Sequence, residues 1–297
     1  MSVHPRPSVP EVMDHEGDLR HMRFLRRMRT IGPMLKMILY LHIAGGSAAL
    51  LSMFIPMVTR KGGLTHRRSG WVFVGGMTIV SITALALSVA RYLFDPRPEA
   101  KAFALFLFYI AILTGAGVSS GIRALRTKDR TIARSHAWDI GLAALLTLTA
   151  LAMAAYGIRS GKALFVGFSV IGLVNGVRGL KYCLRPPAHR MHWWFEHMSS
   201  MLGSCIAATT AFLVVNAPQA GLSRLSLIVW FAPVVIGGPA IAIWTAYYKR
   251  RFANSVMPKT QSQRPIAQDP MPKAQCPRLN DAYSMLNAFA RPSARRT

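Results

Sequence analysis

The sequence predicts an all-α protein, a polytopic transmembrane helical bundle of about seven spans. Hydrophobic residues make up 52% of the 297-residue chain, and its mean hydropathy is +0.30. Seven apolar stretches each come close to the length that a helix needs to cross a bilayer, which is about 20 residues. Basic residues are concentrated in the short segments between these stretches and in the two tails, as is typical of multi-pass membrane proteins.

The chain is predicted to have three parts. Residues 1–33 form a basic amino-terminal tail, residues 34–250 the transmembrane bundle, and residues 251–297 a basic, Pro-rich carboxyl tail. The carboxyl tail is predicted to be disordered, because it cannot bury enough apolar surface to offset the entropy lost on ordering. Within it, Ala282–Ala290 is expected to form a helix only against a partner. The basic segment Arg20–Thr30 is predicted to be either an amphipathic surface helix or a frayed arm.

The predicted spans follow the apolar stretches in order. The first should be retained as a signal anchor, because residues 1–33 lack the apolar centre and cleavage site of a signal peptide. The fourth is short, and the fifth carries Asn175 and Arg178 near its end, where Arg178 is expected to snorkel to the headgroups. The seven spans are Met34–Met57, Trp71–Leu93, Ala102–Ile122, Ile140–Gly157, Ala163–Tyr182, Met198–Val215 and Leu225–Tyr248.

Glycine spacing indicates where the helices pack closely. Gly117 and Gly121, and Gly172 and Gly176, have the small-xxx-small spacing that lets membrane helices approach one another. In the last span, residues 237–239 read Gly-Gly-Pro and are predicted to break or kink the helix.

The loop charges predict an orientation. With seven spans the tails face opposite sides, and the positive-inside rule places the more basic face in the cytoplasm. Basic residues before the first span favour the opposite arrangement, but three loops and the carboxyl tail outweigh them. We therefore expect a multi-pass protein of the bacterial inner membrane with its amino terminus outside and its carboxyl terminus in the cytoplasm. The basic residues of the cytoplasmic face are Arg60, Lys61, Arg67, Arg68, Arg126, Lys128, Arg130, Arg134, Lys181, Arg185, Arg190, Lys249, Arg250 and Arg251, and those of the other face are Arg97, Lys101, Arg159, Lys162 and Arg224.

The net charge of +25 points to membrane lipids as partners. A nucleic-acid-binding protein is not expected, because the charge lies in short loops and tails between apolar spans; anionic headgroups are the expected contact. Homo- and hetero-oligomers are both left open. Cys183, Cys205 and Cys276 form no C-x-x-C pair, so neither a disulfide framework nor a cysteine zinc site is predicted. Five tryptophans near the cytoplasmic interface predict an aromatic belt: Trp71, Trp138, Trp193, Trp194 and Trp244.

Three hairpins on the cytoplasmic face contain histidine followed by tryptophan. Histidines 66, 136 and 192 or 197 would lie at one depth, near the starts of the second, fourth and sixth spans. Imidazoles that converge there could bind a divalent metal ion or haem. Asp139 and Glu196 follow at helical spacing and could orient such ligands or bind the metal themselves. The predicted metal-site residues are His66, His136, His192, His197, Asp139 and Glu196, and His189-x-x-His192 adds a weak histidine motif.

The same residues fit a structural interpretation. Histidines among Arg, Lys and Trp at an interface can bind lipid phosphates or cap helices, and carboxylates near helix starts suit the positive end of the helix dipole. Both interpretations remain open at this point.

His42 lies inside the first span, where a polar side chain is costly and usually has a function or a partner. It is predicted as a cofactor-binding residue. At 1.5 Å per residue it is roughly 20 Å from the cytoplasmic end of its helix, too far to share a metal ion with His66. It could ligate haem b, act in a proton or quinone path, or bond to a neighbouring helix.

Three segments resemble a known family. LHIAGGSAALLSMF, THRRSGWVF and ARSHAWDIG are similar to a bacterial family of membrane proteins classed as domain of unknown function 2306. The shared features fall on His42 and Gly46, on His66, and on His136, within roughly residues 38 to 215. The resemblance implies a membrane fold and no particular activity.

Several functions remain open for a membrane protein of unassigned activity. One is a redox protein linked to b-type haem or quinone. Another is a metal-dependent membrane hydrolase, similar to seven-span zinc-dependent ceramidases, although the last span has no histidine pair. The third is a non-catalytic transporter, assembly factor or lipid-binding component.

Overall fold

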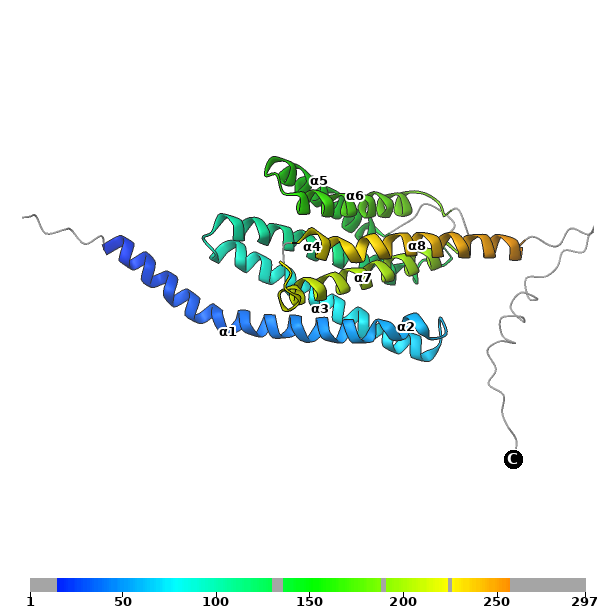
Figure 1. The fold of residues 1–297 in the computed structure, drawn as a ribbon, viewed down its shortest axis with the longest axis horizontal. Coiled ribbons are helices and arrows are strands. Elements are labelled where there is room, and N and C mark those ends of the chain that lie inside the picture. Colours follow the sequence, from blue (N-terminus) through cyan, green and yellow to red (C-terminus); the bar gives the residue numbers. More distant parts are fainter. Residues whose placement is uncertain (1–14, 130–135, 188–190, 224–225, 257–297) are drawn as a thin grey trace, which may run out of the picture. The chain divides into compact units, whose positions relative to one another are not determined.

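The computed structural model describes residues 15–129, 136–187, 191–223 and 226–256, and for residues 15–31 and 251–256 it describes the backbone alone. All regular secondary structure in these residues is helical (Figure 1). The chain divides into a unit of residues 1–250 and a second unit of residues 251–297. Residues 251–256, the start of the carboxyl tail predicted to be disordered, are helical as the end of α8; the rest of that tail, the helix Ala282–Ala290, His189 and Cys276 lie outside the described residues.

The helices follow one another with short connections. In chain order they are α1 His15–Ser52, α2 Phe54–Val58, α3 Leu64–Phe94, α4 Pro98–Ala124, α5 Ala137–Arg159, α6 Ala163–Leu184, α7 His192–Asn216, the 3₁₀ turn η1 Ala217–Ala220, and α8 Leu227–Val256. The backbone of Arg20–Thr30 belongs to α1 and is helical. α8 runs as one helix through Pro233 and Pro239, so residues 237–239 do not interrupt it.

Within the described part of the chain, seven segments are long and apolar enough to cross a membrane, which confirms the predicted bundle. They are Gly32–Val58, Leu64–Phe94, Pro98–Ala124, Ala137–Arg159, Ala163–Leu184, His192–Ala220 and Leu227–Arg250. Most extend beyond the predicted limits because charged residues continue a helix where it leaves the apolar layer. His66, for example, lies in the first turn of α3 instead of in a loop.

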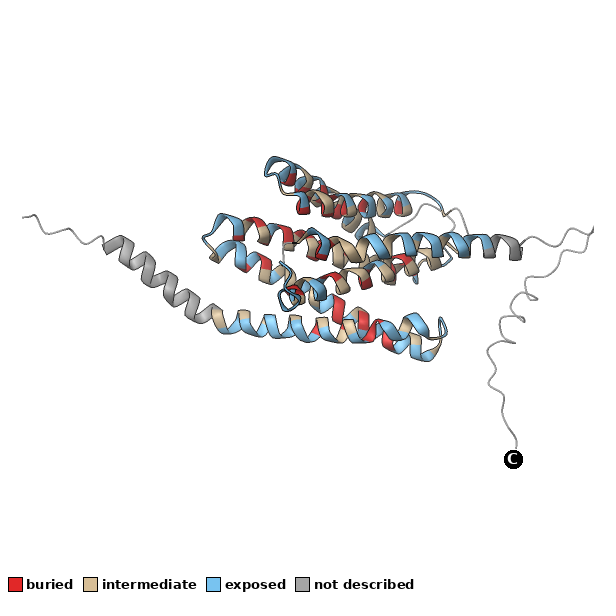
Figure 2. Ribbon diagram, viewed as in Figure 1, coloured by how far each residue is buried: buried red, intermediate tan, exposed pale blue. Residues whose placement is uncertain are grey.

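α4 is the central helix of the bundle. It packs against α3, α5 and α7, while α1 packs along α3 and α5 pairs with α6. α4 is also the most buried span and α8 the least, and Figure 2 shows α1 and α8 exposed along much of their length. α8 contacts its neighbours through long side chains: Phe231 lies over Gly167 of α6, and Ile206 of α7 lies over Gly237.

Glycines allow the closest helix contacts. A Cβ on Gly76 of α3 would lie 2.6 Å from the carbonyl oxygen of Gly45 on α1, so these two backbones touch. The four predicted packing glycines also face neighbouring helices: Gly117 and Gly121 face α7, Gly172 faces Tyr109 of α4, and Gly176 faces Thr147 of α5. The predicted packing role of these glycines is confirmed.

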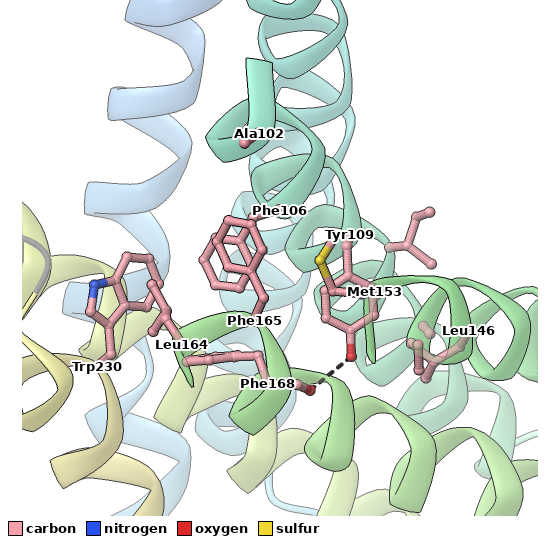
Figure 3. Packing of buried hydrophobic residues seen from close by; sticks show 12 residues of the cluster. Ala102, Phe106, Tyr109, Leu146, Met153, Leu164, Phe165, Phe168 and Trp230 are labelled. Carbon is pink, nitrogen blue, oxygen red and sulfur yellow. Dashed lines mark hydrogen bonds between the residues drawn. The ribbon is translucent and has the colours of Figure 1, made fainter. Parts of the chain in front are cut away.

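An aromatic cluster holds α4, α6 and α8 together (Figure 3). The ring of Phe106 stacks on Phe165 at 4.8 Å between centroids and meets the edge of Trp230 at 5.4 Å. Trp230 is also perpendicular to Phe168 at 5.5 Å. Beside these rings, the hydroxyl of Tyr109 donates a 2.8 Å hydrogen bond to the Phe168 carbonyl. Such stacked and edge-to-face pairs stabilise beyond the area they bury.

Candidate functional site

The predicted histidines do lie at one end of the bundle, at the starts of α3, α5 and α7. His66 closes the turn between α2 and α3, where its Nδ1 lies 3.1 Å from the Pro56 carbonyl oxygen and donates to it. Lys61 Nζ donates to the same oxygen and to the Met57 carbonyl, each at 2.7 Å. Together they satisfy carbonyls that the end of α2 would otherwise leave without partners. Desolvation at this turn lowers the pKa of Lys61.

His136 acts as a helix cap. Its exposed ring is the N-cap of α5, and Nδ1 accepts a 3.2 Å hydrogen bond from the backbone N–H of Trp138. Asp139, in the first turn of the same helix, pairs with Arg123 of α4 instead of with His136. Arg123 Nε contacts Asp139 Oδ1, and Nη2 donates to Oδ2 at 2.8 Å, so the pair is bidentate.

The histidines of α7 each bond to another helix. His192 Nδ1 lies 2.9 Å from the hydroxyl of Tyr182 on α6. His197 Nδ1 donates to the Gly121 carbonyl of α4 at 2.8 Å.

Glu196 links α7 to α6. It accepts hydrogen bonds from Arg178 Nη2 at 3.0 Å and from Ser200 at 3.1 Å. Arg178 therefore has a protein partner, although 48% of its side chain is exposed and it was predicted to reach the headgroups.

Interface aromatics divide into two groups. Trp71, Trp138 and Trp244 are exposed, which fits the predicted belt. Trp193 and Trp194 are half-buried: Lys128 lies over the Trp193 ring at 4.8 Å, and Trp194 packs on Tyr248 of α8 at 5.0 Å.

These histidines and acids do not come together as a metal centre. Among the described residues, no group of three or more His, Cys, Asp and Glu side chains could hold a metal ion. A histidine that donates Nδ1–H to a carbonyl, as His66 and His197 do, is oriented as a metal ligand often is. The histidine rings nevertheless contact different neighbours, and they do not converge on one point. The metal site stays a prediction without geometric support.

His42 faces α3 within the bundle. Its Nδ1 lies 2.9 Å from Thr83 Oγ1, and the Thr83 hydroxyl itself donates to the Ile79 carbonyl at 2.6 Å. This pairing is the neighbouring-helix alternative predicted for His42. Haem or quinone binding at His42 stays a prediction.

The ring of His42 also lines a large, partly open cavity of about 2490 Å³. Helices α1 and α3 to α8 form its walls, and most lining side chains are alkyl or aromatic; among these are Leu39, Phe103, Leu146, Phe168, Trp230 and Val234. Charged side chains lie at its two ends. Arg91, Asp95 and Arg97 lie where α3 ends and α4 begins, and Arg178 and Glu196 lie where α6 ends and α7 begins.

Ion pairs neutralise part of the charge at each end. Arg97 Nη2 contacts Asp95 Oδ2 at 2.8 Å, and this pairing lowers the pKa of Asp95 to about 2. The Asp95 carboxylate in turn raises the pKa of Arg97. At the other end, Arg178 pairs with Glu196.

The sequence alone did not reveal this cavity. It depends on which helices meet, and on glycines such as Gly203 and Gly238 that line it and would meet nothing within 4 Å if they carried a Cβ. The spacing of Leu227, Trp230, Val234, Gly238 and Ile241 on one face of α8 was the available signal.

No protein-family model, curated protein or solved structure matches this chain.

Proposed function

We propose that this membrane protein binds a long-chain lipophilic molecule in the cavity between its helices, and that it acts by binding or carrying that molecule. The single observation behind the proposal is the cavity of about 2490 Å³ with apolar walls and charged ends. Pockets for compact ligands usually measure about 300–1,000 Å³, so this cavity suits an extended chain better.

The distribution of polar groups supports a lipid-like occupant. A molecule with alkyl chains gains free energy by contact with apolar walls, and it needs polar partners only at an end. Here the charged side chains are confined to the two ends of the cavity, and His42 is the one ionisable side chain that lines its middle among the described residues.

A metal-dependent hydrolase receives less support. It requires three ligands around one ion, whereas the described histidines bond individually to Pro56, Trp138, Tyr182 and Gly121.

A fluorescence experiment tests the proposal. Trp230 lines the cavity and is only 5% exposed, whereas Trp71 and Trp138 are each 61% exposed. Purified protein in detergent is titrated with methyl dibromostearate, whose bromines quench nearby indoles. The signal of Trp230 is the difference between wild type and Trp230→Phe. We expect this difference to be quenched saturably, and an unquenched Trp230 would overturn the proposal.

A matched pair of variants separates the cavity from the outer lipid-facing surface. Gly203 lines the cavity and Gly141 does not, and a Cβ on either would meet nothing within 4 Å. Gly203→Phe should fill part of the cavity and weaken the quenching of Trp230. Gly141→Phe adds the same side chain to an exposed position and should leave it unchanged. Equal effects of the two substitutions on the quenching of Trp230 would mean that methyl dibromostearate binds outside the cavity.

We propose further that the protein lies in a bacterial inner membrane with the basic loops and the carboxyl terminus in the cytoplasm. The excess of Lys and Arg at that end supports this orientation. Green fluorescent protein fused to the carboxyl terminus should fluoresce in a bacterial host, and alkaline phosphatase fused there should be inactive. The reverse result would invert the orientation. Membership of the family classed as domain of unknown function 2306 also remains a proposal.

A further inference from the structure

We infer that His42 is a hydrogen-bond acceptor for the hydroxyl of the molecule bound in the cavity, so that the ligand is a long-chain compound with an O–H group at its polar end. The inference rests on the proposed function, because it names the chemistry of the occupant.

Hydrogen bonding assigns the tautomer of His42. Thr83 Oγ1 carries one hydrogen, which the carbonyls of Ile79 and Val80 on its own helix accept at 2.6 and 3.1 Å. Thr83 can therefore only accept from His42, and the proton of the imidazole must be on Nδ1. Nε2 then carries a lone pair and no proton, since a second proton would place a charge inside the membrane.

This lone pair is available to a ligand. His42 lines the cavity, and no described residue donates to its Nε2. The Val80 carbonyl, which lies 3.1 Å from Thr83 Oγ1, also contacts the imidazole and can only accept its proton. A neutral acceptor in an apolar site favours a donor such as a hydroxyl, because an unmatched polar group there costs free energy.

The position of His42 leaves room for a chain. Leu35, Leu39, Gly46 and Leu50 line the cavity from the same face of α1, so alkyl and backbone surface extends on both sides of the ring. His42 is 10 residues from Ser52, where α1 ends, or about 15 Å along the helix. Gly46, one turn away, has no Cβ to narrow the approach to the ring.

A pair of competitors that differ only in the donor tests the inference. Hexadecanol and methyl hexadecyl ether each compete with methyl dibromostearate, and recovery of Trp230 fluorescence gives their affinities. In wild type we expect hexadecanol to bind roughly two- to tenfold more tightly, the range that one net hydrogen bond provides. Palmitic acid, titrated at acidic and alkaline pH, distinguishes a carboxylic O–H from an alcohol.

Three substitutions, one at His42 and two at Thr83, examine the role of His42 itself. His42→Phe keeps a ring of similar size and removes the acceptor, so both competitors should bind with equal affinity. Thr83→Val releases Nδ1, allows the Nε2–H tautomer and should reduce the preference for the alcohol, because that tautomer can donate to the ether. Thr83→Ser keeps the hydroxyl and should behave as wild type.

The outcomes separate the two proposals. If methyl dibromostearate fails to quench Trp230, the proposed function is wrong. If it quenches while hexadecanol and the ether compete equally in wild type, or if the preference survives in His42→Phe, the cavity binds chains but His42 does not select a hydroxyl.

Discussion

The contact between Gly45 and Gly76 yields a sharp stability prediction. In Gly76→Ala, the new Cβ would lie 2.6 Å from the Gly45 carbonyl oxygen and 3.1 Å from both Cβ and the backbone nitrogen of Ala49. Two of these three atoms belong to the backbone of α1, so no side-chain rotation relieves the overlap. α1 must move away from α3, and overpacking of this kind costs about 1–3 kcal/mol.

Gly75→Ala is the matched control. Gly75 is the preceding residue of the same helix, is exposed, and has nothing within 4 Å of the position of its Cβ. Both substitutions gain the same helix propensity, about 0.5–1 kcal/mol for Ala over Gly. The difference between the two variants therefore isolates the steric term.

Unfolding in mixed detergent micelles with increasing dodecyl sulfate provides the assay. We expect Gly76→Ala to be less stable than Gly75→Ala by about 1–3 kcal/mol. Equal free energies of unfolding would mean that α1 does not contact α3 at this position, and the packing argument would be refuted.

Three other predictions concern hydrogen bonds and charge. Asp139→Asn should destabilise the protein by about 1–3 kcal/mol, because the half-buried Arg123 loses a bidentate partner; a double-mutant cycle with Arg123→Gln measures the coupling, and additive losses would contradict it. Tyr109→Phe should cost about 0.5–1.5 kcal/mol in the same unfolding assay, since it removes the bond to the Phe168 carbonyl and little volume; no loss would show that this bond is absent in the membrane protein. Arg97 lowers the pKa of Asp95 from 3.8 to about 2. The ionised Asp95 therefore makes its full contribution to the stability of the folded protein above pH 3.8, and this contribution is lost as the pH falls through about 2. Thermal unfolding of Asp95→Asn should accordingly depend less on pH in that range than wild type does, and parallel curves would rule this out.

The helices were predictable from the sequence, whereas their side-chain partners were not. Apolar stretches identify spans locally, because each must by itself exclude polar groups from the bilayer. The small-residue spacing at Gly172 and Gly176 likewise predicted a helix-packing face. It did not predict that Tyr109 and Thr147 would be the residues packed against that face. Gly45 and Gly76 are on different helices, so their contact has no signature in a single segment.

The polar pairs illustrate the same limit. Asp139 and Glu196 were assigned to the histidines at helical spacing, yet each bonds to an arginine from a preceding helix. Arg123 is 16 residues from Asp139, and Arg178 is 18 residues from Glu196. The charged arginine is the stronger hydrogen-bond donor to a carboxylate, and the antiparallel hairpins place it within reach. The partner of His42 is further away in the sequence than those of Asp139 and Glu196. Thr83 is 41 residues from His42, and it comes within reach only because α1 packs on α3.

The central position of α4 has a consequence for how the protein is made. α4 emerges from the ribosome well before α7, although Gly117 and Gly121 of α4 receive Ser204 and Met201 from that later helix. Until α7 is inserted, this face of α4 has only lipid against it. A nascent chain truncated before His192 would leave that face of α4 without its partner helix. We expect a membrane quality-control protease to recognise such a chain as incompletely folded.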